Sequence, residues 1–274
     1  MNRRISLYVV ALAVVFAVHP AFAAPLPACA GPVEAASVQV VRVEKNGALI
    51  LDDGRAVHVE GLLLPAGARD RGPDFLASQA LNELSTLTHG RGATLTDMPP
   101  KEDRYGRVRA QVFLPDETDP WLQVAMLRRG LARVSLAPDR RECAHELYAA
   151  EAGARAAKNG LWASPAYAIR TPYDLARDTG TFQVVEGEVL AATMKDGRAY
   201  LDFGPDWRTD FTVSIAPDDM RTFETVGVDP RTYQGKTIRV RGFLQQLDGP
   251  EIEVASPEAI EVVADAPLKP ALAR

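Results

Sequence analysis

The sequence predicts a mainly β protein with helices (an α+β class), built as two small β-barrel domains in series. Three observations lead to this prediction. Short apolar or alternating segments, separated by turn residues, recur in both halves of the chain, as expected for strands. Three segments of the first half instead carry apolar residues at helical spacing. Proline and polar residues interrupt both patterns after residue 163, which indicates a boundary between two units.

The order of the elements in the first half predicts a small closed barrel of OB type. We expect three strands, a helix, two more strands and two further helices, an order typical of that fold. The expected strands are 38–43, 49–51, 56–64, 93–97 and 107–114, and the expected helices lie within 72–89, 121–129 and 139–158. Asp52-Asp53-Gly54-Arg55 is a hairpin signal, because glycine accepts the positive φ of a tight turn.

The second half repeats this order at a smaller size. Five strand-like segments, with one helical piece between the third and the fourth, predict a second OB-like barrel. The strands are 182–190, 198–203, 211–215, 236–244 and 251–254, and the helix is 217–226.

The first 23 residues have the pattern of a secretory signal peptide. Arg3 and Arg4 precede an apolar run over 5–18, and Ala21-Phe22-Ala23 forms a small-residue cleavage site. No later segment has the roughly 18 apolar residues that a spanning helix needs, so we expect no membrane span. The sequence predicts an exported protein, periplasmic or secreted. A lipoprotein with its lipid on Cys29 is the weaker alternative, because Pro27 is awkward there and the apolar run ends well before the cysteine.

The expected organisation of the 274 residues follows from these signals. A chain of this length suits two compact domains better than one, and an Ala/Pro-rich end is expected to be disordered. The predicted parts are a signal peptide 1–23, an N-terminal segment 24–37, a first domain 38–165, a linker 166–179, a second domain 180–264 and a disordered tail 265–274.

The charge of the protein limits its partners. The formal net charge is −5, and removal of Arg3 and Arg4 with the signal peptide lowers it to −7. This is the wrong sign for binding nucleic acid by bulk electrostatics, so nucleic acid is disfavoured and any phosphate binding has to be local. An envelope protein or an anionic ligand is the expected partner.

Two cysteines in an exported chain predict one disulfide between Cys29 and Cys143. In the entropic model, closing so long a loop stabilises the fold by about 4 to 5 kcal/mol. A cysteine-bound metal is not expected, because too few further ligands lie nearby in the sequence.

The segment from Val40 to Ala66 resembles the opening strands of staphylococcal nuclease-like (thermonuclease) proteins. Their usual pattern is V-V-R-V-x-D-G-D-T-L-x-L-x-D-G-R-x-V-R-L-x-G-I-D-A-P-E. Further matches lie at Asp103–Arg107 (D-[RK]-Y-G-R), at Arg129–Val134 (G-x-A-x-V) and from Glu151 to Trp162 (E-x-x-A-[RK]-x-x-x-x-G-L-W). Together they cover about 38–165, and the resemblance implies the nuclease-like OB barrel with three helices.

The same resemblance implies the chemistry of calcium-dependent phosphodiester hydrolysis. Carboxylates hold the calcium, a glutamate activates or orients water, and two arginines neutralise phosphate charge. In this chain, the two metal-holding aspartate positions fall on Gly47 and Leu63, and the glutamate position falls on Ala66. The arginine positions fall on His58 and Arg107. The sequence therefore predicts a degenerate site without metal or cofactor, and a non-catalytic binding or interaction module.

An active metal-dependent nuclease with a rearranged site is the alternative. Its acids would be Glu44, Glu60 or Asp70, and calcium is needed only in that case. We expect Glu60 to be a solvated strand residue and His58 to be partly exposed. A register shift around Asn46, which would place Glu44 at the position assigned to Gly47, also stays open.

Arg107 has two interpretations, between which the sequence does not decide. It could bind a phosphate or another anion, or form an ion pair with Asp103 or Glu102.

In the second domain, Trp207 and Arg208 form a candidate ligand surface for stacking. Most of the nearby aromatic residues, Phe203, Phe211 and Phe243, are expected in the core. In a third interpretation the second domain carries the function and the first is its scaffold.

Overall fold

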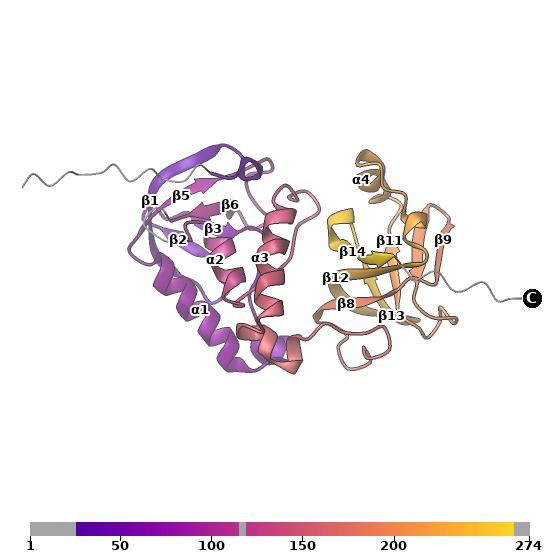
Figure 1. Ribbon diagram of the computed structural model, residues 1–274. Coiled ribbons are helices and arrows are strands. Elements are labelled where there is room, and N and C mark those ends of the chain that lie inside the picture. Colours follow the sequence, from indigo (N-terminus) through magenta and orange to yellow (C-terminus); the bar gives the residue numbers. More distant parts are fainter. Residues whose placement is uncertain (1–25, 115–118, 266–274) are drawn as a thin grey trace, which may run out of the picture.

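The computed structural model describes residues 26–114 and 119–265, and within them two β units lie side by side (Figure 1). We call residues 33–167 the first domain and residues 182–265 the second domain. The predicted signal peptide lies outside the described residues, as does the predicted tail except for residue 265. Across 26–114 and 119–265, no helix is long and apolar enough to cross a membrane.

The first domain is a closed five-stranded barrel, which confirms the predicted fold class. Its strands run in the order β1-β2-β3-β6-β5, and each neighbouring pair is antiparallel except β3 and β6. The bounds are β1 Val33–Val43, β2 Leu49–Leu51, β3 Ala56–Val59, β5 Gly92–Thr96 and β6 Val108–Phe113.

The predicted third strand ends earlier than expected. It is broken at Gly61, which has a φ of +84°, and the chain leaves the barrel there. The next residues form β4 (Leu62–Leu63), which pairs with β7 (Arg133–Val134) in a small separate sheet. A side chain at position 61 would also lie 2.7 Å from a methyl group of Leu147, so only glycine fits this turn. The segment after Gly61 is thereby placed outside the barrel.

Three helices cover the barrel: α1 (Asp74–Thr88), α2 (Leu122–Arg128) and α3 (Ala144–Ala156). The third begins five residues later than the predicted Asp139. Tertiary bonds hold the preceding loop, because Asp139 accepts hydrogen bonds from Arg109, and the Arg140 side chain donates to the backbone carbonyl of Met98. These contacts compete with another turn of helix.

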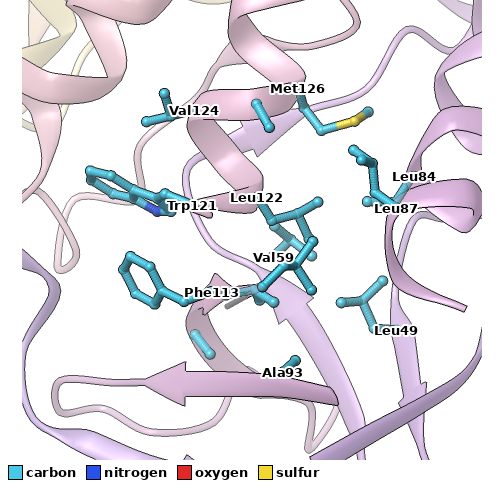
Figure 2. Close-up of a cluster of buried hydrophobic side chains, with 14 of the residues drawn as sticks. Leu49, Val59, Leu84, Leu87, Ala93, Phe113, Trp121, Leu122, Val124 and Met126 are labelled. Atoms are coloured by element: carbon cyan, nitrogen blue, oxygen red, sulfur yellow. The ribbon is translucent and has the colours of Figure 1, made fainter. Parts of the chain in front are cut away.

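Figure 2 shows the core of the first domain, where side chains of α1 and α2 point toward the barrel strands. Burying each large apolar side chain stabilises the fold by about 1.5–3 kcal/mol. The members labelled there are Leu49, Val59, Leu84, Leu87, Ala93, Phe113, Trp121, Leu122, Val124 and Met126.

The predicted disulfide between Cys29 and Cys143 is confirmed, with the two Cα atoms 5.1 Å apart. Since Cys29 is bonded in this way, its sulfur is not available for the lipid of the lipoprotein alternative.

The second domain is one curled sheet of seven strands and a short helix, α4 (Met220–Thr225). Its order is β14-β12-β13-β11-β10-β9, with β8 paired to β12, and within residues 182–265 no ladder joins the two ends. The bounds are β8 Phe182–Glu188, β9 Ala191–Lys195, β10 Arg198–Asp202, β11 Thr212–Ile215, β12 Lys236–Leu247, β13 Gly249–Glu253 and β14 Ile260–Asp265. The prediction missed β9 and β14, which are short strands formed by pairing with β10 and β12.

Helix α3 lies on the side of the first domain that faces β12 and β14 (Figure 1). Arg241 of β12 pairs with Glu151 of α3 at 2.8 Å and with Glu261 of β14 at 2.5 Å. The guanidinium of Arg241 also lies 4.2 Å from the ring centre of Tyr148, whose hydroxyl donates to the backbone carbonyl of Glu258. The interface is therefore built on buried charges that are paired, as buried charges must be.

A second set of contacts lies at the start of β8. Arg133 donates to the backbone carbonyl of Phe182 at 2.7 Å and to Asp70 at 3.0 Å. Tyr167, just before the second domain, is buried and donates from its hydroxyl to the other oxygen of Asp70 at 2.9 Å. These bonds hold β8 beside the segment that follows β4.

Candidate functional site

A pocket of about 460 Å³ lies between the two domains. The first domain contributes the turn before β2, the end of β3, the segment 62–66, part of α1 and Arg107. The second domain contributes Phe182 and Phe243, and residues 180–181 just before it also line the pocket. The five positions assigned from the nuclease-like pattern all line this one pocket: Gly47, His58, Leu63, Ala66 and Arg107. The structure thus places them together, although they come from different elements.

Leu64 fills the space that a side chain at position 47 would need. Gly47 has a φ of +82°, and a Cβ there would lie 2.7 Å from the δ1 methyl of Leu64. The turn is held by the Gly47 N–H, which donates to the Glu44 carbonyl at 2.9 Å, and by the Asn46 side chain, which accepts from Ala48. Gly47 lines the pocket and Glu44 does not, so the pocket gives no support to a register shift around Asn46.

Glu60 was expected to be a solvated strand residue. It does not face solvent, so this expectation was wrong. Its side chain is 4% exposed and accepts two hydrogen bonds from Arg109 of β6, at 2.9 and 3.2 Å. Strand β3 ends at Val59, so the alternation that predicted an outward side chain does not extend to Glu60.

Asp70 is also buried, and its two oxygens are used. One accepts from Arg133 and from the backbone N–H of Ala66, and the other accepts from the hydroxyl of Tyr167. Burial lowers the pKa of Arg133, an effect that the Asp70 carboxylate opposes. Glu44, the third acid of the alternative, pairs with Arg42 at 3.2 Å. Each of the three acids is therefore paired with an arginine.

The residues of the pocket do not fit calcium. Such an ion needs about 6 to 8 oxygen ligands, whereas Gly47, Leu63 and Ala66 offer no side-chain oxygen. Among the residues that the structure describes, Asp70 is the one acidic residue that lines the pocket. In residues 26–114 and 119–265, no three His, Cys, Asp or Glu side chains form a group that could hold a metal ion.

The two basic positions of the resemblance have different surroundings. Burial lowers the pKa of His58, while Glu60 raises it and Arg107 lowers it further, so the surroundings favour the neutral ring. Arg107 pairs with Asp103 at 2.6 Å and lies 5.3 Å from the ring centre of Tyr105. The ion pair named as one interpretation is therefore present. Binding of a phosphate by Arg107 stays a prediction.

Comparison with known families identifies the first domain. Residues 74–164 match the family described as Staphylococcal nuclease homologue. This part of the chain is a staphylococcal nuclease-like domain. The match includes Arg107 but begins at α1, so positions 47, 58, 63 and 66 precede it. No curated protein matches the chain.

In the second domain, beside the nuclease-like domain, the division of the aromatic residues between core and surface differs from the one predicted. Phe203 and Phe211 are in the core, and Trp207 is 53% exposed with Arg208 stacked 4.5 Å from its ring centre. The core assignment of Phe243 was wrong, because this side chain is 62% exposed and lies edge-on to Phe182. Phe243 lies opposite Phe182 in the β8–β12 ladder, and both line the pocket.

Sequence reasoning missed several residues of this site. Phe182, Phe243, Lys45 and Arg69 all line the pocket, but none matches a position of the nuclease-like pattern. The run Leu62-Leu63-Leu64 was a usable signal, because three consecutive leucines cannot all point inward from a strand of alternating faces. They are half-buried in the structure.

Proposed function

We propose that the protein is an exported binding module whose nuclease-like domain does not cleave nucleic acid. The observation that carries the proposal is the contact between Leu64 and the Gly47 turn. It leaves no room for an acidic side chain at position 47 without a shift of Leu64. Function depends on the site rather than on the fold, so membership of the family does not itself imply cleavage.

The remaining acids support the same proposal. Glu60 and Asp70 are buried, and each is paired with an arginine that is itself buried. Removing either from its partner would leave an uncompensated buried charge, which costs about 3–5 kcal/mol. They are therefore poor ligands for an added cation. The rearranged metal site gains no support from this arrangement.

Export is supported by two features. Arg3, Arg4 and the apolar run that follows have the pattern of a signal peptide. The disulfide between Cys29 and Cys143 is of the kind that persists in oxidising compartments. A periplasmic or secreted location accounts for both.

The test is a cleavage assay with single-stranded DNA and RNA in the presence of calcium. We expect no cleavage above a buffer control. Cleavage that a chelator abolishes, and that Arg107→Ala also abolishes, would overturn the proposal. Arg104→Ala is the matched control, because Arg104 belongs to the same turn but does not line the pocket. Calorimetric titration with calcium should show no heat of specific binding.

A further inference from the structure

We propose that the pocket between the two domains binds an aliphatic carboxylate of the fatty-acid class. The ligand has a compact anionic head and an apolar body. This inference rests on the proposed function, because it assigns a ligand to a pocket that has lost its catalytic acids. The volume of about 460 Å³ lies in the usual range for sites that bind small molecules.

The walls of the pocket are apolar and come from both domains. Leu63, Leu64 and Leu81 of the nuclease-like domain face it, as do Phe182 and Phe243 of the second domain. Leaving Phe243 62% exposed is unfavourable, because apolar surface gains about 25 cal/mol per Å² when it is removed from water. Leu63, Leu64 and Leu81 are half-buried, and together with Phe243 they leave apolar surface in a concave site, which marks a binding surface. An aliphatic chain would cover them.

The charge of the pocket is opposite to that of the protein. Counting only described residues, four lysine or arginine side chains and one acidic side chain line it, in a chain with a net charge of −5. Arg107 and Arg133 are already paired, with Asp103 and Asp70. Lys45 and Arg69 are exposed and form no ion pair with any residue in 26–114 or 119–265. These two cations are available to an anionic head.

The combination of apolar walls and exposed cations excludes two simpler classes of ligand, neutral lipids and polynucleotides. A neutral lipid would use the leucines and phenylalanines but leave Lys45 and Arg69 without a role. A polynucleotide would meet leucine side chains where it needs polar and cationic groups along its backbone. An anion with an apolar body uses both sets of residues.

The pocket does not require a folding step before it binds. Arg133 joins β7 to the backbone of β8, and Arg241 joins β12 to α3, so the two walls are held in place. A preformed site avoids the ordering cost that weakens association.

Calorimetric titration of the whole protein tests the proposal. The ligands are decanoate, kept below its micelle-forming concentration, 1-decanol as the uncharged equivalent, and thymidine 5′-monophosphate as a polar anion. We expect decanoate to bind at least about tenfold more tightly than either of the others, because only decanoate satisfies both the apolar walls and the cations.

Two variants, each with a matched control, locate the site. Lys45→Glu with Arg69→Glu should weaken decanoate binding about tenfold, whereas Lys195→Glu with Arg221→Glu, which reverses two exposed cations away from the pocket, should not. Phe243→Ala should weaken it about fivefold. Phe75→Ala is its control, because Phe75 is 66% exposed and does not line the pocket. Circular dichroism checks that each variant is folded.

The outcomes separate this inference from the proposed function. Absence of decanoate binding, equal binding of 1-decanol, tighter binding of thymidine 5′-monophosphate, or equal effects of variants and controls would overturn the ligand class. None of these results restores cleavage, so the non-catalytic proposal would stand. Calcium-dependent cleavage in the separate assay would overturn the proposed function, whether or not decanoate binds.

Discussion

Arg241 of β12 reaches across the domain boundary to Glu151 of α3, and both side chains are almost completely buried. Glu151 accepts hydrogen bonds from Arg241, from Arg155 and from the backbone N–H of Val134. The carboxylate therefore ties α3 to β7 within the nuclease-like domain and to β12 of the second domain. This one group couples the orientation of the second domain to the packing of the first.

Arg241→Ala should lower the free energy of unfolding by about 3 kcal/mol. This loss of stability should lie at the low end of the range for a broken buried ion pair, because Arg155 and the Val134 N–H still donate hydrogen bonds to Glu151. Urea unfolding followed by tryptophan fluorescence measures it. Arg231→Ala is the control, since Arg231 pairs with Asp229 at the surface, and it should leave the midpoint unchanged. Equal losses in the two variants would show that the bridge contributes nothing.

Removing the disulfide should also destabilise the protein. The bond joins residues 114 positions apart, and the entropic model gives about 4 to 5 kcal/mol for such a loop. The double variant Cys29→Ser with Cys143→Ser should show this loss in urea unfolding, and reduction of the native protein should reproduce it. A loss below about 1 kcal/mol would mean that the reduced unfolded chain is already constrained.

The contact between Gly47 and Leu64 predicts coupling in a double-mutant cycle. Gly47→Ala should cost about 1–2 kcal/mol for the left-handed backbone and more for the contact with the Leu64 methyl. In a Leu64→Ala background the contact is gone, so the same substitution should cost about 1 kcal/mol less. Gly54→Ala is the control, because Gly54 has a φ of +88° with nothing within 4 Å of an added Cβ. Equal costs at positions 47 and 54 would contradict the prediction.

His58 predicts a pH dependence of stability. Burial lowers its pKa below the ordinary value of 6.5, so the unfolded state binds a proton more readily than the folded state does. Its contribution to stability is fully present above pH 6.5 and is lost as the pH falls from 6.5 through the folded pKa. The native protein should therefore lose stability over this range relative to His58→Gln. Titration by NMR, with the His58 signal assigned from that variant, gives the pKa directly. A value of 6.5 or above would refute the prediction.

The sequence predicted the five pocket positions 47, 58, 63, 66 and 107 because local motifs carry them. A turn, a strand and the D-[RK]-Y-G-R segment each have a recognisable pattern, and the barrel brings these elements together. The same patterns could not show that Leu64 lies over Gly47, because a contact between residues 17 positions apart depends on the break at Gly61.

The errors share one physical cause. The alternation of faces along an expected strand predicted that Glu60 faces solvent. The apolar side chain of Phe243 predicted that this residue lies in the core. Each of these rules describes one element alone. Glu60 is buried because Arg109 of another strand faces it, and Phe243 is exposed because β12 turns that side toward the gap between the domains. Arg133 and Arg241 hold no defined position of the nuclease-like pattern, and each bonds to both domains: Arg133 to Asp70 and the Phe182 carbonyl, and Arg241 to Glu151 and Glu261.

The sequence by itself determined the class of the fold, the disulfide, and the absence of acidic side chains at positions 47, 63 and 66. These depend on residue type and on spacing along one chain segment. The tertiary structure decided that both domains form the pocket, that its exposed cations are Lys45 and Arg69, and that buried arginines hold the domains together. The reason is that burial and charge pairing depend on distances in space, and residues from distant segments set those distances.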